Sequence, residues 1–306
     1  MSVTVRAPAK VNLALIVGPP REDGYHPLNT VYQAISLYDD VRVSDAEDWV
    51  VSVHPIGEVD VSVVPLDDSN IALRAGRALV AHHGLELAAD IVIHKGIPVA
   101  GGLAGGSADA AATLVALDRL WDLRTTDEDL LAIAGELGSD VPFALMGGTA
   151  VGTGRGEQLS PALARGRFDW VLVISDEGMS TPDVYDELDD YRSTGSSFVP
   201  PVPVRPAVFP PVLQALRQGD ARMLGATAHN DLSHAALRLR PVLDDIINLG
   251  LSQGALTGIV SGSGPTLAFL ADDEQAAVAL QVVLSAAGHE TMHVHGPVPG
   301  ARIIPT

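Results

Sequence analysis

The pattern of apolar and polar positions predicts a strand, a glycine-rich loop and a helix in the middle of the chain. Residues Asp90–His94 alternate in polarity like a short strand. The segment Pro98–Ala111, PVAGGLAGGSADAA, then places four glycines within six residues. From Ala108 to Trp121 most positions are apolar, and they occupy two faces of a helix. We therefore expect this helix to pack on two sides and to provide a firm platform for the loop.

Apolar periodicity elsewhere predicts a mixture of strands and helices. We expect Val3–Arg6 and Val11–Val17 to form two strands, separated by Ala7–Lys10. Further strands are expected at residues 33–37, 40–44, 50–54, 170–175, 255–260, 266–270 and about 290–295, with a glycine-bearing strand and turn at 147–156. Further helices are expected from a cap at 67–70 to about 82, at 126–137, after Pro142, and at about 181–191, 210–217, 220–236, 240–252 and 273–287.

The length of 306 residues suggests about two domains. The glycine-bearing segment at 147–156 places the boundary there, so we expect one domain at 1–155 and a second at 156–306. Residues 200–211, PPVPVRPAVFPP, contain six prolines. This composition predicts a semi-rigid, exposed connection that contributes nothing to a core.

The glycine loop is typical of an anion site. Glycine lets the backbone approach a ligand closely, and the first turn of the next helix carries unpaired N–H groups and the positive end of the helix dipole. Phosphate is the usual occupant of such a site. The structural alternative is a glycine-rich turn in which Ser107 caps the helix. The chain contains no Walker A sequence, no dinucleotide-type glycine pattern, and no HRD or DFG sequence of protein kinases.

Composition narrows the classes of function. Asp and Glu outnumber Lys and Arg 38 to 19, which gives a net charge of −19 and argues against general nucleic-acid binding. An anionic ligand must therefore be held by local donors. The absence of cysteine excludes disulfides and thiolate sites, and the ten histidines form no metal-binding pattern. With no apolar run of about 18 residues and no signal-peptide core in MSVTVRAPAK, we expect a cytoplasmic protein without a membrane partner.

The two lysines are candidates for specific roles, because the other seventeen basic residues are arginines. A lysine ammonium is a compact point charge, suited to crowded sites where a guanidinium does not fit. Lys10 lies in the segment APAKVNL, and Lys95 ends the strand that leads into the glycine loop. The structural alternative for Lys10 is a solvated charge at the end of a strand.

A second group of candidates follows an Asp-Gly turn near the N-terminus. In Asp23-Gly24-Tyr25-His26, the following Pro27 disfavours helix, so Tyr25 and His26 are expected side by side on an ordered loop. An aromatic ring beside an imidazole suits a flat, hydrogen-bonding ligand, although a surface histidine is the structural alternative.

Asp140 is a further candidate. It precedes Pro142 at the start of a short helix, where a carboxylate also has a common structural role.

Three separated motifs, APAKVNL, PVAGGLAGGSADAA and SGSGPT, together resemble the GHMP small-molecule kinases. Within that superfamily, KVNL, DGYH and GSDVPF are most similar to the members that act on a diphosphocytidyl acceptor. The resemblance extends over essentially the whole chain. It implies a two-domain α+β fold, with an N-terminal ATP-binding domain, a C-terminal ferredoxin-like domain and an active site between them. It also implies ATP-dependent phosphorylation of the 2-hydroxyl of 4-diphosphocytidyl-2-C-methyl-D-erythritol in the non-mevalonate isoprenoid route.

The resemblance also implies roles for individual residues. Lys10 and Asp140 would be catalytic, with Asp140 acting either as a base or as an orienting group. Asn12, Tyr25, His26, Asp140, Thr181 and Tyr185 would contact the acceptor, and relatives often have Phe in place of Tyr185. ATP, accompanied by Mg²⁺ with no protein metal ligand assigned, would contact Asn70, Lys95, Pro98, Val99, Ala100, Gly101, Gly102, Leu103, Ala104, Gly105, Gly106, Ser107 and Ala108.

Two alternatives remain open at this point. The chain could be another GHMP enzyme, such as a homoserine or mevalonate-type kinase or a related decarboxylase, although Tyr25 and His26 favour an acceptor that carries a flat base. It could instead be a catalytically inactive sensor that binds ATP and regulates a partner. The presence of both Lys10 and Asp140 argues against the sensor, because a protein that only binds ATP needs neither.

Overall fold

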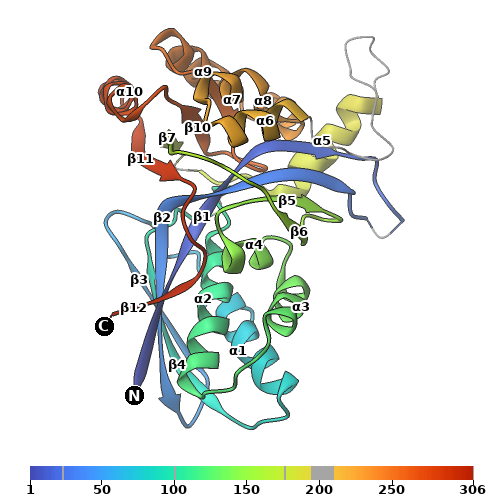
Figure 1. Cartoon of the computed structure of the whole chain (residues 1–306), viewed down its shortest axis with the longest axis vertical. Helices are drawn as coiled ribbons and strands as arrows, with labels where there is room; N and C mark the ends of the chain where they lie inside the picture. Colours follow the sequence, from blue (N-terminus) through green and yellow to red (C-terminus); the bar gives the residue numbers. More distant parts are fainter. Residues whose placement is uncertain (23, 100, 176, 194–209, 306) are drawn as a thin grey trace.

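The computed structural model describes residues 1–305 except 23, 100, 176 and 194–209. The proline-rich segment predicted at 200–211 therefore lies almost wholly outside the described residues. Figure 1 shows two groups of elements, one around the long N-terminal strands and one around the later strands and helices. The described residues form two β-sheets, each covered by helices, and this confirms the predicted α+β class.

The first sheet is built on two very long strands. β1 (Ser2–Val17) and β2 (Leu28–Ala46) pair antiparallel along their whole length. The central order is β12-β1-β2-β4-β3, and β5 pairs with β2 and β6, while β8 pairs with β1. The other strands of this sheet are β3 (Val50–Pro55), β4 (Ala88–Lys95), β5 (Thr149–Thr153), β6 (Gln158–Pro161), β8 (His229–Asn230) and β12 (Arg302–Ile304).

The prediction of broken N-terminal strands was wrong. β1 passes through Ala7–Lys10 without interruption, because shifts of register after Pro8 and after Asn12 absorb the irregularity. The predicted break between residues 37 and 40 is also absent, because β2 continues through Asp39. Asp39 is fully buried, and its carboxylate accepts hydrogen bonds from the backbone N–H groups of Gly96 and Ile97. A strand can continue through a polar residue when hydrogen bonds satisfy its buried side chain.

Helices cover one face of this sheet (Figure 1). They are α1 (Ile71–His82), α2 (Gly105–Leu120), α3 (Asp127–Leu137) and α4 (Val141–Met146). The predicted cap at Thr126 and the Pro142 start of α4 are confirmed. As the apolar pattern predicted, α2 packs on two sides, against β1 and β2 and against α1 and α4. Ten of its residues are buried, which fixes the helix firmly beneath the loop that precedes it.

The second sheet is a four-stranded antiparallel sheet with the order β11-β7-β10-β9. Its strands are β7 (Phe168–Ile174), β9 (Thr257–Val260), β10 (Leu267–Leu270) and β11 (Glu290–Gly296). In chain order this is 4-1-3-2, the order of a ferredoxin-like sheet. The helices of this half are α5 (Thr181–Ser193), α6 (Pro210–Gln218), α7 (Ala221–Thr227), α8 (Leu232–Leu239), α9 (Val242–Ser252) and α10 (Glu274–Ala286).

The predicted single helix at 220–236 was wrong, because the segment forms two helices separated by β8. The break occurs at Asn230, which is buried and donates hydrogen bonds to the carbonyl oxygens of Val260 and Gly262 at 2.8 and 2.7 Å. Asn230 thereby ties the break between α7 and α8 to the turn after β9.

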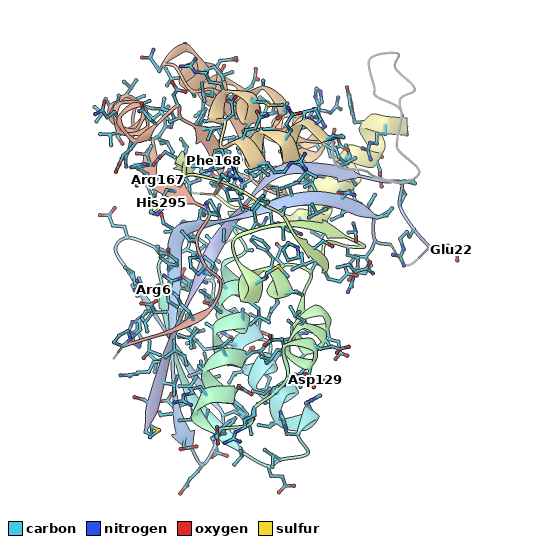
Figure 2. All side chains as sticks on the ribbon, in the orientation of Figure 1. Arg6, Glu22, Asp129, Arg167, Phe168 and His295 are labelled. Carbon is cyan, nitrogen blue, oxygen red and sulfur yellow. The ribbon has the colours of Figure 1, made fainter. Side chains whose placement is uncertain are left out.

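Side-chain bonds join the two sheets where β11 passes β2. The backbone N–H of His295 donates to Ser36 Oγ at 2.9 Å, and Trp170 Nε1 donates to Gln33 Oε1 at 3.2 Å. Figure 2 shows His295 and Phe168 at this junction. Because β12 returns to pair with β1, the C-terminal strand belongs to the first sheet. The domain boundary at residue 155 therefore stays a prediction. Among the described helices, none is long and apolar enough to cross a membrane.

Candidate active site

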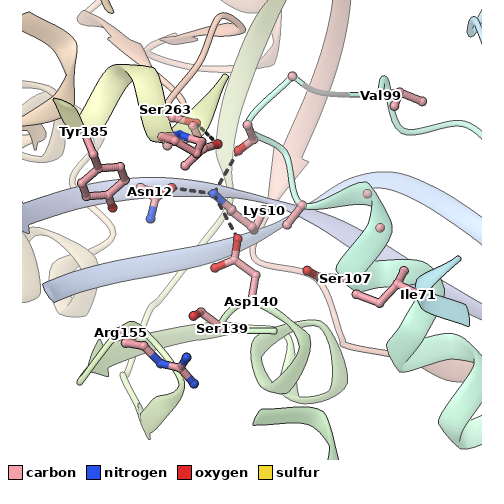
Figure 3. A pocket seen from close by; sticks show the side chains of 18 of the residues that line it. Lys10, Asn12, Ile71, Val99, Ser107, Ser139, Asp140, Arg155, Tyr185 and Ser263 are labelled. Atoms are coloured by element: carbon pink, nitrogen blue, oxygen red, sulfur yellow. Dashed lines mark hydrogen bonds and ion pairs between the residues drawn. The ribbon is translucent and has the colours of Figure 1, made fainter. Parts of the chain in front are cut away.

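A cavity of about 770 Å³ lies between the glycine loop, the long N-terminal strands and α5. Figure 3 shows residues from both halves of the chain around it, among them Lys10, Asp140 and Ser263. The SGSGPT segment reaches the cavity through Gly262 and Ser263. The three motifs that are far apart in the sequence therefore meet at one place.

The glycine loop runs directly into α2, which begins at Gly105. Ala104 precedes it in a left-handed conformation, with φ of 62°, and no side chain caps the helix. Ser107 is therefore not the N-cap that the structural alternative required; it lies inside the first turn. The N–H groups at the start of α2 face a cavity instead of a capping side chain, as an anion site requires.

The SGSGPT turn packs directly on the loop at Gly102. The carbonyl oxygen of Gly102 accepts hydrogen bonds from Lys10 Nζ at 2.9 Å and from Ser261 Oγ at 3.2 Å. Gly102 has a φ of 75°, and a Cβ there would lie 2.1 Å from the carbonyl oxygen of Ser261. Only glycine allows this approach, so the loop and the turn hold each other in place.

Lys10 is buried on β1 and points into the cavity (Figure 3). Its Nζ donates to Asn12 Oδ1 at 2.8 Å and lies 3.7 Å from Asp140 Oδ2. Burial lowers the pKa of Lys10 below its ordinary value, and the charge of Asp140 only partly opposes this. Asn12 in turn donates to Thr30 Oγ1 at 2.8 Å, which orients its amide oxygen toward the lysine.

Asp140 stands at the start of α4, and its side chain makes no capping bond to that helix. Oδ1 instead accepts a hydrogen bond from the hydroxyl of Tyr32 at 3.0 Å. Burial raises the pKa of Tyr32 well above its ordinary value, and the charge of Asp140 adds to this effect, so the tyrosine remains a donor. Asp140 therefore does not cap α4 with its side chain, which was the structural alternative considered for it.

Lys95 lies behind the glycine loop in a buried ion cluster. Its Nζ contacts Asp39 Oδ2 at 2.5 Å and Asp109 Oδ2 at 2.7 Å. Burial alone would lower the pKa of Lys95, but the charges of Asp109 and Asp39 outweigh it and raise that pKa. Burial and the neighbouring charge of Asp39 raise the pKa of Asp109 well above its ordinary value. Asp109 Oδ1 has no hydrogen-bond partner among the described residues.

The residues predicted to contact ATP fall into three groups. Those that line the cavity are Asn70, Lys95, Pro98, Val99, Gly101, Gly102, Ala104, Gly105, Gly106 and Ser107. Leu103 and Ala108 are buried in the hydrophobic core instead, and Ala100 lies outside the described residues. Asn70 is also the N-cap of α1, because its Oδ1 accepts from the N–H of Ala72 and its Nδ2 donates to Pro65.

The predicted acceptor residues gather at the other end of the cavity. Tyr25 is 53% exposed there, while His26 is buried with its ring 5.0 Å from that of Tyr185. His26 Nε2 lies 3.0 Å from Asp189 Oδ2, and burial raises the pKa of Tyr185. Thr181 Oγ1 lies 2.8 Å from Ser263 Oγ, so α5 is also tied to the SGSGPT turn.

Several residues of the site were not found from the sequence. Tyr32, Ser263 and Arg155 line the cavity, and Asp189 contacts His26. Ser263 belongs to a motif already singled out, so its motif was a usable signal. The other three lie in segments without a distinctive pattern, and only the tertiary structure brings them to the cavity.

Comparison with known proteins agrees with this geometry. The profile "GHMP kinases N terminal domain" matches residues 70–148, and "GHMP kinases C terminal" matches residues 212–290. A "4-diphosphocytidyl-2-C-methyl-D-erythritol kinase" of Leifsonia xyli subsp. xyli is 52% identical over 303 residues, which is 99% of each chain. The enzyme of the same name from Thermobifida fusca is 52% identical and covers 99% of this chain and 98% of its own.

Two solved structures share this fold to the same degree but differ in sequence identity to this chain. A crystal structure of a 4-(cytidine 5'-diphospho)-2C-methyl-D-erythritol kinase aligns with a TM-score of 0.73 at 32% identity, over 96% of this chain and 98% of the other. A homoserine kinase from Cytophaga hutchinsonii also reaches 0.73, over 99% and 97%, but at only 19% identity, so it supports the fold alone. From the sequence relationship along its full length, the chain belongs to the 4-diphosphocytidyl-2-C-methyl-D-erythritol kinases of the GHMP kinase family.

Proposed function

We propose that this chain transfers the γ-phosphoryl group of ATP to the 2-hydroxyl of 4-diphosphocytidyl-2-C-methyl-D-erythritol, with Lys10 and Asp140 at the reacting hydroxyl. The observation that carries this proposal is the single cavity that joins the glycine loop, the Lys10–Asp140 pair and the Tyr25–His26 end. A phosphate donor and a base-bearing acceptor can occupy its two ends while their reacting groups meet at the pair.

The glycine loop and the first turn of α2 bind the nucleotide phosphates in this proposal. A Cβ at Gly106 would meet only Ile71 Cγ2, at 3.6 Å, so the space beside this residue is open to a ligand. Backbone N–H groups at the start of α2 donate to the phosphate oxygens. Ser107 and Asn70 lie beside them at the cavity wall.

Lys10 and Asp140 act on the acceptor hydroxyl. The attacking oxygen forms a bond to the γ-phosphorus, the bond to the β-phosphate oxygen breaks, and the hydroxyl loses its proton. Asp140 Oδ2 faces the hydroxyl, since Oδ1 is held by Tyr32, and it orients that group or takes the proton. The Lys10 ammonium lies within 3.7 Å of Asp140 and neutralises charge that develops during transfer. Asp140→Asn separates the two roles, because the amide still orients the hydroxyl but accepts no proton.

The acceptor's cytosine binds at Tyr25 and Tyr185, with His26 at its edge. Tyr25 is half-exposed, and Tyr185 comes from α5 in the other half of the chain. Asn12 and Thr181 contact the remainder of the acceptor between this end and Asp140. Residues 1–155 and 156–306 then form the two domains that enclose the acceptor.

Mg²⁺ neutralises phosphate charge when it accompanies ATP. Among the described residues, no group of three or more His, Asp or Glu side chains is placed to hold a metal ion. The carboxylates that line the cavity are those of Asp109, Asp140 and Asp186. A cation bound mainly to phosphate oxygens and water would need only one or two of them. Because ATP is its phosphoryl donor, we place the enzyme in the cytoplasm.

The test of this function is an assay coupled to ADP release, with 4-diphosphocytidyl-2-C-methyl-D-erythritol, homoserine and mevalonate as acceptors. ADP release should require the diphosphocytidyl acceptor and Mg²⁺, and the product should carry the new phosphate on the 2-hydroxyl. Turnover with homoserine or mevalonate alone would refute the assignment. ATP binding without turnover of any acceptor would favour the sensor instead.

Tyr25→Ala tests the cytosine site. Stacking on a base contributes about 1–3 kcal/mol, so the KM for the acceptor should rise at least several-fold while the KM for ATP changes little. Steady-state kinetics with each substrate varied in turn measures both values. An equal rise in the two KM values would contradict a cytosine site at Tyr25.

A further inference from the structure

Arg155 is a cavity residue to which nothing above gives a role. It lies in the turn between β5 and β6, and its guanidinium carbon is 5.0 Å from the centre of the Tyr25 ring. Figure 3 shows it on the same side of the cavity as Ser139 and Asp140. The chain carries a net charge of −19, so its overall field repels an anionic ligand. A cation in the cavity wall is therefore a candidate to bind such a ligand.

The other two cations of the cavity wall already have partners. Lys10 Nζ is bonded to Asn12 and Gly102 and lies near Asp140, and Lys95 is held between two carboxylates. By contrast, Arg155 forms no ion pair with a carboxylate in the part of the chain that the structure describes. Its charge is therefore available to an anionic ligand.

The turn that carries Arg155 is fixed between the two ends of the proposed acceptor site. Gly154 and Gly156 flank it with φ of 73° and 110°. A Cβ at Gly156 would lie 2.3 Å from the hydroxyl oxygen of Tyr32, the group that donates to Asp140. Arg155 thus lies with Tyr25 on one side and the Tyr32–Asp140 pair on the other.

We propose that Arg155 binds the diphosphate of the acceptor. This inference rests on the proposed function, in which the cytosine binds at Tyr25 and the reacting hydroxyl at Asp140. In that acceptor the diphosphate joins the cytidine to the methylerythritol, so it must lie between those two points, where Arg155 is. The planar guanidinium donates paired hydrogen bonds to phosphate oxygens and also contacts the Tyr25 ring, which holds both groups in place.

Truncated ligands test this role without turnover. Calorimetry on the full chain should show that CDP binds more tightly than cytidine, because only CDP presents a diphosphate. In Arg155→Met, affinity for CDP should fall roughly 10- to 100-fold, as expected for the loss of a charge-assisted hydrogen bond to a buried anion. Affinity for cytidine should stay within about twofold. Arg155→Lys keeps the charge without the planar fork and should retain part of the CDP affinity.

Arg217→Met is the matched control, because Arg217 is exposed on α6 and its replacement changes the net charge equally. It should leave both affinities unchanged. An unchanged ratio of CDP to cytidine affinity in Arg155→Met would overturn the inference, as would an equal loss of ATP affinity, which would assign Arg155 to the nucleotide. Failure of the proposed function is distinguishable, since it would appear as no acceptor phosphorylation by the unaltered chain.

Discussion

Lys10 and Lys95 are both buried, and both belong to motifs near the phosphate loop, yet their surroundings differ in one respect that separates their roles. Lys95 contacts two carboxylates, at 2.5 and 2.7 Å, and its pKa is raised. Lys10 has one carboxylate at 3.7 Å and two neutral oxygen acceptors, and its pKa is lowered. Burial acts on both lysines in the same direction, so the number and distance of the carboxylates decide the outcome.

The difference indicates how the molecule uses its only two lysines. Lys95 is fully compensated, and it joins β2, β4 and α2 beneath the loop. Lys10 carries a charge that its neighbours compensate only in part, so an anionic transition state at this point gains from it. The expectation that Lys95 contacts ATP stays a prediction: Lys95 lines the cavity, and its ammonium contacts the carboxylates of Asp39 and Asp109.

Replacing Lys95 should produce the largest loss of stability. Lys95→Met removes the counter-ion of the buried Asp39 and Asp109 side chains, and breaking a buried pair in this way typically costs about 3–5 kcal/mol. Urea unfolding should show this loss, with Lys10→Met as the matched variant and a clearly smaller effect. Equal losses in the two variants would remove the distinction between the sites.

Replacing Lys10 should chiefly reduce turnover. Lys10→Ala and Lys10→Arg should each lower kcat roughly 100- to 1,000-fold, since the first removes the charge and the second inserts a wide guanidinium beside Gly262 and Asn12. Their KM for ATP should change little. A double variant with Asp140→Ala should lose far less than the sum of the single losses, because the two residues act together. Near-full activity in Lys10→Ala would exclude Lys10 from the chemistry.

The two glycines at the start of α2 differ in how close they lie to Lys95. A Cβ at Gly105 would lie 3.0 Å from Lys95 Nζ, whereas one at Gly106 would enter open space near Ile71. Gly105→Val should therefore destabilise the fold by about 1–3 kcal/mol, and its effect on ATP binding cannot be separated from damage to the ion cluster. Gly106→Val should keep the stability of the protein and weaken ATP binding about tenfold or more. Unchanged ATP affinity in a folded Gly106→Val protein would refute the phosphate site.

Asp109→Asn should have the smallest effect. The pKa of Asp109 is raised in the folded chain above its unfolded value near 3.8, so the folded state favours the protonated form. The stability gained from this proton is fully present below pH 3.8 and is lost as the pH rises through the raised pKa. Asparagine imitates the protonated form at every pH, so the variant should stay within about 1 kcal/mol of the parent at low pH. The urea midpoint of the parent relative to that of the variant should fall as the pH rises, because only the parent carries the Asp109 carboxyl group.

Some features of the site could be predicted because they depend on local chemistry. The glycine loop, the α2 helix behind it and the Asn70 cap follow from backbone conformation and from apolar spacing, which are properties of neighbouring residues. The motifs also identified Lys10 and Asp140 as candidates, and the structure places these two side chains together. Ser107 was expected as a possible cap and is not one, because the N-cap position is taken by Ala104, three residues before Ser107.

Other features could not be predicted, because they depend on partners distant in the chain. Asp39 resembles the end of a strand until Lys95 and the N–H groups of residues 96 and 97 are brought to it. Tyr32 resembles one more residue of a strand until α4 presents Asp140. For the same reason, Arg155 resembles an ordinary turn residue until β5 pairs with β2 and places it beside Tyr25.

The family, the α+β class, the phosphate loop and the two candidate lysines could all be predicted from the sequence, because short motifs and local apolar spacing encode them. What those lysines face depends on the tertiary structure. The charge state of a buried group depends on every carboxylate within a few ångströms, and here those carboxylates come from positions 39, 109 and 140, on three different elements. Packing of β2, α2 and α4 around the loop therefore commits one lysine to the scaffold and leaves the other facing the proposed acceptor.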